Sequence, residues 1–184
     1  MATSDEFLLT QYKQGNPLAF RELVERYTTP IYNLAYRFLR DAMEAENVTQ
    51  ETFLRVLTSL ERVRLDIPFK PYLFRIAVNL CHDLARKARP TLFSDLDPRD
   101  DVTESFADDA PALWERLVQE ELRARLIAAL DDLPAPYQTA IILRYVEEFS
   151  YEEIAQALNL PLNTVRTHLR RAKQQLRVML GSRD

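Results

Sequence analysis

The chain has 184 residues, 47% apolar and 28% charged, a soluble balance that can bury a core and argues against a wholly disordered chain. Its two glycines cannot supply a glycine-rich phosphate loop, which argues against P-loop and dinucleotide-binding enzymes. One cysteine excludes an intramolecular disulfide and a zinc ribbon, and two distant histidines offer no metal-ligand set. We therefore expect no metal and no cofactor. No signal peptide and no membrane-length apolar run are found, so we expect a cytoplasmic protein.

The net charge of −4 is unevenly distributed along the chain. Residues 1–90 and 122–184 each carry a net charge of +2, whereas residues 91–121 carry 2 basic and 10 acidic residues. That acidic stretch has two prolines and no helical period, which is typical of a linker, and charge alone favours a solvated spacer. We therefore expect an all-α protein with two small helical domains, a bundle at 1–90 and a second domain at 112–184, joined by a flexible acidic linker at 91–111.

Two amphipathic helices are expected in the first part of the chain. The first begins at the cap formed by Asn16 and Pro17, and Pro30 is expected to restart or kink it. The second covers about 43–64. The periodicity predicts an inward face of Ala45, Val48, Thr52, Val56 and Leu60 and an outer face of Glu46, Gln50, Glu51 and Arg55. Taken alone, this outer face is an ordinary solvated surface.

A helix over about 69–89 carries a polar stripe opposite its apolar one. The stripe consists of Arg75, Asn79, His82, Arg86 and Arg89, with Lys87 beside it. Such a surface can pair with phosphates and hydrogen-bond base edges, and Tyr72 and Phe74 at its start could receive an unstacked base. The alternative, which the helix alone leaves equally open, is a solvated basic face with Tyr72 and Phe74 in the core.

The last part of the chain predicts a helix-turn-helix. Helices are expected over about 112–131 and 136–147, and Ser150 and Glu153 form a capping box that begins a short helix. A tight turn leads to a helix over about 162–180, whose exposed face holds Thr164, Arg166, Thr167, Arg170, Arg171, Lys173 and Arg177. Its first half can enter a major groove, although a basic terminal helix in a bundle is the alternative.

Four segments in order resemble one family. EEFSYEEIAQALNLPLNTVRTHLRRAKQQLRVML, preceded by LPAPYQTAIILRY, is similar to the −35 reading domain of bacterial sigma factors of the extracytoplasmic-function (ECF) group. DAMEAENVTQETFLRVLTSL resembles the helix with which that group binds the RNA polymerase β′ clamp, and PFKPYLFRIAVNLCHDLARKAR resembles its −10 element reader. The whole order, with a short acidic linker between the two halves, is highly specific.

The resemblance implies three sets of site residues. Those for −35 DNA are Thr164, Arg166, Thr167, Arg170, Arg171 and Lys173; those for −10 DNA are Tyr72, Arg75, Asn79, His82, Arg86 and Lys87; those for polymerase are Gln50, Glu51, Phe53 and Arg55. The implied partners are core RNA polymerase, through its β′ clamp and β flap, promoter DNA and an anti-sigma factor. Nothing implies membrane insertion, a catalytic residue or a metal.

Three hypotheses follow. The favoured one is a dissociable initiation subunit that directs core polymerase to promoters by reading −35 and −10 elements. The second is a free-standing dimeric helix-turn-helix regulator that binds palindromic sites without polymerase. The third is a helical hydrolase that uses acidic pairs such as Glu152 and Glu153, but helix capping explains these residues better and no base–nucleophile set is visible.

Overall fold

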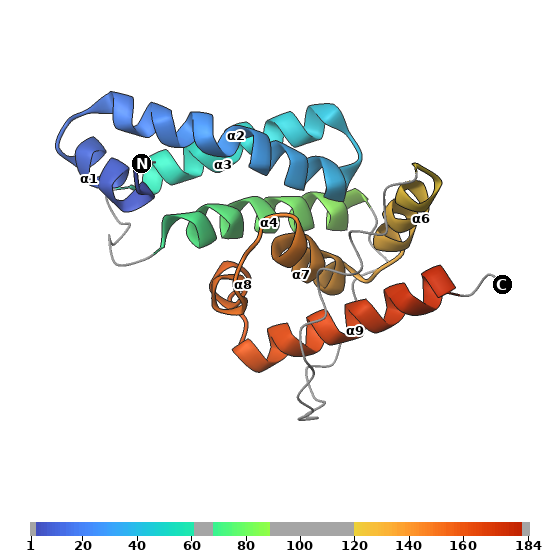
Figure 1. Ribbon diagram of the computed structural model, residues 1–184. Coiled ribbons are helices and arrows are strands. Elements are labelled where there is room, and N and C mark those ends of the chain that lie inside the picture. The colour runs from blue at the N-terminus through green and yellow to red at the C-terminus, as the bar shows by residue number, and fades with distance from the viewer. Residues whose placement is uncertain (1–2, 61–67, 89–119, 182–184) are drawn as a thin grey trace.

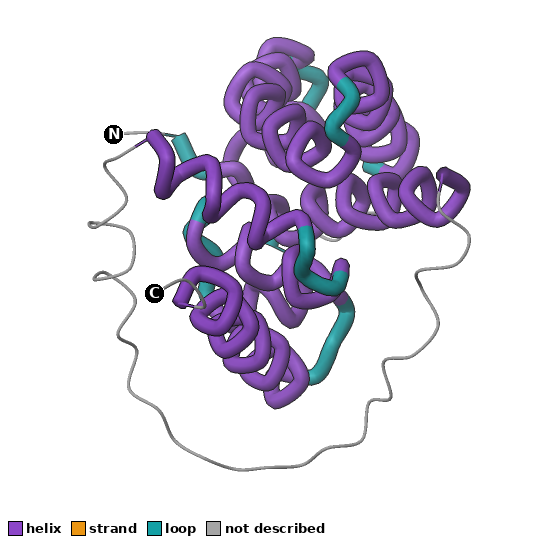
Figure 2. The backbone as a smooth tube through the Cα atoms, turned by 90° about the vertical axis from the view of Figure 1, so that its right-hand side faces the viewer, coloured by secondary structure: helices purple, strands orange, loops and turns teal. Residues whose placement is uncertain are grey.

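The computed structural model describes residues 3–60, 68–88 and 120–181, and all regular structure within these ranges is helical (Figures 1 and 2). In chain order the helices are α1 (Asp5–Lys13), α2 (Pro17–Leu39), α3 (Ala42–Ser59), α4 (Phe69–Ala88), α6 (Glu120–Asp131), α7 (Ala135–Tyr145), α8 (Tyr151–Leu158) and α9 (Leu162–Gly181). This confirms the all-α fold. The predicted linker at 91–111, the stretch 112–119 of the predicted 112–131 helix and Arg89 lie outside the described residues.

Side-chain caps fix where several helices begin. The predicted capping box is present at α8, where the Ser150 hydroxyl accepts from the Glu153 backbone amide at 3.1 Å and the Glu153 carboxylate accepts from the Ser150 amide at 2.8 Å. Asn16 caps α2 as expected, with its side chain accepting from the Leu18 amide at 3.1 Å. Asp41 caps α3 in the same way. Local sequence therefore sets these helix starts.

Helix α1 is an addition that the sequence patterns did not predict. It is capped by Ser4 and buries Leu8 and Leu9. Its Asp5 carboxylate accepts hydrogen bonds from the Arg26 guanidinium, at 2.6 Å, and from the Tyr27 hydroxyl, so α1 is tied to α2. Burial and the adjacent Asp5 carboxylate raise the pKa of the Tyr27 hydroxyl well above its ordinary value.

Helix α2 continues through Pro30, so the expected restart of the helix at this position is wrong, and the alternative of a kink stays a prediction. Proline removes one backbone donor, a local defect. Burial on both sides of it compensates, because Tyr27, Ile31 and Leu34 are all buried against the rest of the bundle. Tertiary packing here outweighs the local signal.

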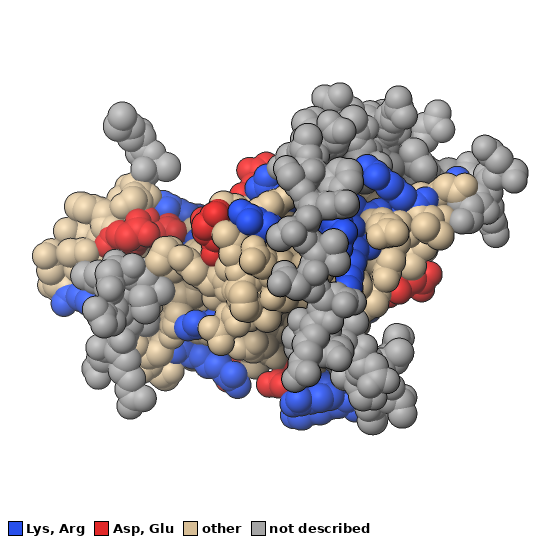
Figure 3. Space-filling view, turned by 90° about the horizontal axis from the view of Figure 1, so that it is seen from below, with Lys and Arg blue, Asp and Glu red and all other residues tan. Residues whose placement is uncertain are grey.

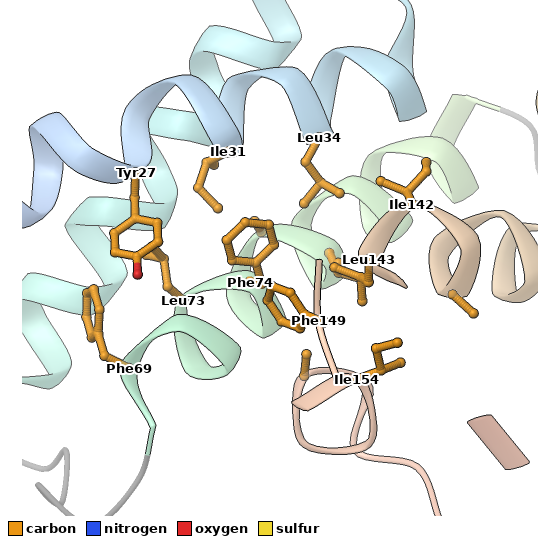
Figure 4. Close-up of a cluster of buried hydrophobic side chains, with 14 of the residues drawn as sticks. Tyr27, Ile31, Leu34, Phe69, Leu73, Phe74, Ile142, Leu143, Phe149 and Ile154 are labelled. Atoms are coloured by element: carbon orange, nitrogen blue, oxygen red, sulfur yellow. The ribbon is translucent and has the colours of Figure 1, made fainter. Parts of the chain in front are cut away.

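The helices of the two predicted domains share one hydrophobic cluster. Figure 4 shows Leu34 of α2 and Phe74 of α4 beside Leu143 of α7 and Phe149 of the loop before α8. The rings of Phe74 and Phe149 meet edge to face, with centroids 4.9 Å apart, and both side chains are fully buried. The division into domains at 1–90 and 112–184 stays a prediction from sequence, but the described helices of both parts pack together.

Candidate nucleic-acid interface

Helix α9 is held on α7 and α8 by an apolar stripe. Val165, Leu169, Ala172 and Leu176 are buried, as the periodicity predicts. Met179, expected on the same inner face, is 39% exposed, although the end of α9 still contacts α6, where Arg125 donates to the Leu180 carbonyl at 3.0 Å. The turn before α9 begins at Asn159, which adopts the left-handed conformation with φ 53°, one of the few conformations that ends a helix this tightly.

The first half of α9 presents the predicted polar side chains at its surface. Arg166 is exposed, whereas Thr164, Thr167 and Arg170 are half-buried. The Thr167 hydroxyl donates to the backbone carbonyl of Asn163 at 2.9 Å, which fixes its orientation on the helix. Figure 3 views the face on which α9 lies and shows patches of Lys and Arg side chains there. This half of the helix can therefore offer donors to phosphates or base edges.

Two other residues expected to contact DNA are directed toward α7 instead. The Arg171 guanidinium donates to the Tyr137 hydroxyl at 3.3 Å. The Lys173 ammonium lies 5.3 Å from the ring centroid of Tyr145. His168 packs edge to face on Tyr137, with centroids 5.4 Å apart, and its burial, together with the charge of Arg171, lowers the pKa of its imidazole.

The polar stripe of α4 is only partly open to solvent. Asn79, Arg86 and Lys87 are exposed, and Arg75 is half-buried. Arg86 pairs with Asp83 at 3.0 Å on the surface, an interaction that a stronger anion could replace. Most of this stripe therefore remains available to a nucleic acid in the structure.

The two aromatic residues at the start of α4 have different environments. Phe74 is fully buried, so for this residue the core alternative is correct and a role as a base-stacking platform is wrong. Tyr72 is half-buried, and its hydroxyl lies 2.7 Å from the Ser59 hydroxyl at the end of α3. The Arg75 guanidinium stands 5.3 Å from the Tyr72 ring centroid, so these two residues form one aromatic and cationic unit.

His82, on the same stripe, is covered by the C-terminal helices. Its Nε2 lies 3.2 Å from the Thr139 hydroxyl of α7, and its ring packs edge to face on Phe38 at 5.8 Å. Burial lowers the pKa of His82, with the Asp83 carboxylate opposing the shift. His82 is thus half-buried beside α7, with part of its surface open to solvent.

Three further contacts hold the two groups of helices together. The Lys70 ammonium donates to the Glu147 backbone carbonyl at 2.7 Å and lies 4.5 Å from the ring centroid of Phe149. Burial raises the pKa of the Glu147 carboxyl, which nearby Arg37 and Lys70 partly oppose. At the other end, Arg40 binds both carboxylate oxygens of Asp131, at 2.6 and 2.7 Å.

The outer face of α3 carries the polar residues that the periodicity predicts, but one residue of the expected polymerase-binding set does not lie on it. Gln50 is exposed, and Arg55 pairs with Glu51 at 2.7 Å. Phe53 is 9% exposed and belongs to the core, so its expected place on the polymerase-binding surface is wrong: it falls on the inward side of the helix. Sequence reasoning missed Leu54 and Leu57, which are 56% and 40% exposed; apolar residues outside the buried stripe are the signal that could have found them.

In the described parts of the chain, no cluster of three His, Cys, Asp or Glu side chains could hold a metal ion. Of the described helices, none combines the length and apolar character required for a membrane span.

Known proteins resemble the chain in both halves. The family profile of Sigma-70 region 2 matches residues 23–91, and that of Sigma-70, region 4, matches residues 123–176. The ECF RNA polymerase sigma factor SigW of Bacillus subtilis is 32% identical over 94% of each chain. The RNA polymerase sigma-H factor of Pseudomonas aeruginosa is 33% identical over 94% of this chain and 91% of its own.

A solved structure of CnrH in complex with the cytosolic domain of CnrY matches 99% of this chain and 100% of its own, with 27% identity and a TM-score of 0.73. The sigma factor RpoE of Bartonella quintana, solved in complex with the anti-sigma factor NepR, shares the fold at a TM-score of 0.65 and 22% identity. Two helical units with exposed basic helices, matched by these profiles, define a promoter-reading transcription initiation factor. The chain belongs to the sigma-70 family and, within it, to the ECF RNA polymerase sigma factors.

Proposed function

We propose a division of labour for this sigma factor, in which residues 1–90 bind core polymerase and read the −10 element and residues 112–184 read the −35 element. The observation that carries it is a pair of helices, α4 and α9, each buried along one side and bearing Arg and other polar groups on the opposite side. Residues 1–90 and 122–184 each carry a net charge of only +2, so each reader alone binds DNA weakly and depends on the polymerase for affinity and spacing.

The −35 surface is the first half of α9. Arg166 and Arg170 lie four residues apart on one side of the helix, where they can donate to phosphates or bidentately to guanine. Thr164 and Thr167 lie beside them near the helix start, which is the part that enters the groove in helix-turn-helix proteins. A single bidentate Arg–guanine pair gives about 1–3 kcal/mol of discrimination.

The −10 surface is the polar stripe of α4, with Tyr72 and Arg75 at one end and Arg86 and Lys87 at the other. A base captured from the nontemplate strand requires unstacking, at about a few kcal/mol, and a site open enough to receive it. Because the imidazole of His82 contacts the Thr139 hydroxyl of α7, we propose that full use of this stripe requires the C-terminal helices to separate from α4. Polymerase binding is proposed to hold the two halves apart.

Core polymerase is proposed to bind the outer face of α3. The exposed apolar pair Leu54 and Leu57 supplies burial, and Gln50, Glu51 and Arg55 supply a polar rim, the composition of a typical partner surface. By analogy with the similar structures solved with CnrY and NepR, an anti-sigma factor is a proposed partner. The protein is proposed to act in the cytoplasm and to catalyse no reaction itself.

Reconstitution with purified bacterial core polymerase tests these assignments. The protein is added to core, and the holoenzyme selects and transcribes DNA from a library randomised across a promoter-length region. Enrichment of two elements at a fixed spacing is expected. Leu54→Asp should abolish core binding, whereas Arg166→Ala should leave core binding intact and weaken only the −35 preference. A protein that binds palindromic DNA tightly without core, or never redirects core, would contradict the proposal.

A further inference from the structure

Arg171 and Lys173 differ from the other basic residues of α9 because both have aromatic partners on α7. Arg171 donates to the hydroxyl of Tyr137, near the start of α7, and Lys173 lies over the ring of Tyr145, the last residue of α7. Two side chains only two positions apart on α9 thus reach both ends of one helix. Eight residues separate the two tyrosines, which corresponds to about 12 Å along α7.

These two contacts are placed to hold the crossing angle between α9 and α7. The buried stripe of α9, including Leu169 and Ala172, packs the helix on α7 and α8, and the contacts of Arg171 and Lys173 add restraints at the two ends of α7. From Ala172 to Leu162, the first residue of α9, is about 15 Å along the axis. A rotation of about 10° at the crossing would therefore move the start of the helix by about 2.5 Å, enough to break hydrogen bonds to DNA.

We infer that Arg171 and Lys173 are positioning residues, which hold α9 at its reading angle by binding Tyr137 and Tyr145 of α7, and that Arg166 and Arg170 make the DNA contacts. This inference rests on the proposed role of α9 as the −35 reader. Tyr137 is 3% exposed and cannot touch DNA, so any effect of this side chain on base preference must act through the angle of α9.

The surroundings of Arg171 support this role. His168 packs on the same Tyr137 ring, and its lowered pKa favours the neutral imidazole, so no second cation competes with Arg171 at physiological pH. The hydroxyl of Tyr137 therefore accepts a hydrogen bond from the cationic Arg171 side chain and is not exposed to solvent. Lys173, in turn, lies over an aromatic face, where a cation is attracted by the ring.

The test uses holoenzyme and the DNA fragment that it selects most often, with affinity measured from low to moderate salt. Arg166→Ala, the matched control, should reduce the slope of log affinity against log salt by about 0.9, the loss of one phosphate contact. Tyr137→Phe removes only a hydroxyl and no charge. It should lower affinity about 5-fold or more, as if one base contact were weakened, leave the slope unchanged and broaden the selected −35 bases.

Arg171→Met should weaken binding as much as Tyr137→Phe, and the double variant no more than either, with circular dichroism and core binding unchanged. The pair Lys173→Met and Tyr145→Leu should behave likewise. A slope reduced by about 0.9 in Arg171→Met, with Tyr137→Phe unaffected, would make Arg171 a phosphate contact and overturn the inference. An unchanged affinity in both would overturn it as well. If wild-type holoenzyme selects no −35 element, the proposed function itself fails.

Discussion

Replacing Phe74 and Phe149 by leucine, singly and together, tests the packing between the N-terminal and C-terminal helices. The two rings are fully buried, and their centroids lie 4.9 Å apart in an edge-to-face arrangement. Leucine keeps each site apolar but removes the ring, so each single substitution should cost about 1–2 kcal/mol of unfolding free energy. Substitution by alanine would remove too large a part of the unfolding free energy of a chain of ordinary stability.

The informative quantity is the coupling between the two substitutions. An aromatic pair contributes about 0.5–1.5 kcal/mol beyond the apolar area that it buries, so the double variant should lose less stability than the sum of the singles by that amount. Urea unfolding of the full chain, followed by circular dichroism, gives the four free energies of the cycle. The slope of the unfolding transition should stay the same in all four proteins.

A control cycle pairs Phe149→Leu with Leu8→Ala. Leu8 is buried in α1, which packs mainly on α2, so this pair should be additive within about 0.3–0.5 kcal/mol. If Phe74→Leu and Phe149→Leu are equally additive, the rings do not meet in solution. The described contacts between α4 and the C-terminal helices, including those of Lys70 and His82, would then have to be abandoned.

Four smaller changes have defined outcomes. Burial lowers the pKa of His82, so the folded chain binds fewer protons there and stability should fall as the pH drops below about 6.5; His82→Gln should flatten this decline in urea unfolding. The pKa of the Glu147 carboxyl is raised in the folded chain, so the free energy of unfolding should fall as the pH rises and this carboxyl ionises. Glu147→Gln should therefore stabilise the chain at neutral but not at acid pH. Ser150→Ala removes the capping box and should cost about 1 kcal/mol in thermal unfolding. Asp131→Asn breaks a surface ion pair and should cost less than about 1 kcal/mol, decreasing further with added salt.

Periodicity and capping signals could predict most of the fold. The inward stripe of α3 and the capping box of α8 are local properties of the sequence, and both are confirmed. Pro30 does not end α2, because the burial of Tyr27 and Ile31, a tertiary effect, holds the helix together across it. Helix α1 escaped prediction although Ser4 and its acidic first turn were readable as a helix start.

The candidate site was less predictable, because helical periodicity gives a direction but not a neighbour. Phe53 and Leu54 are adjacent apolar residues, and only the packing of α3 shows that the first is buried and the second exposed. Arg171 falls outside the buried stripe of α9, yet its long side chain reaches the hydroxyl of Tyr137, 34 positions earlier in the chain. His82 similarly lies on a polar stripe, yet its imidazole contacts Thr139 of α7, a contact between distant segments.

The position of Thr139 over His82 has a thermodynamic consequence for promoter occupancy. When the DNA-competent form is a minor population, the apparent dissociation constant rises in inverse proportion to that population, tenfold for every 1.4 kcal/mol or so that favours the closed packing. Any ligand that binds only the form in which α7 has separated from α4 raises the population of that form, so a second ligand of the same form binds more tightly. Polymerase and promoter would then be positively cooperative ligands of this chain without touching each other, and a molecule that bridges α4 and α7 would act as a competitive antagonist of both.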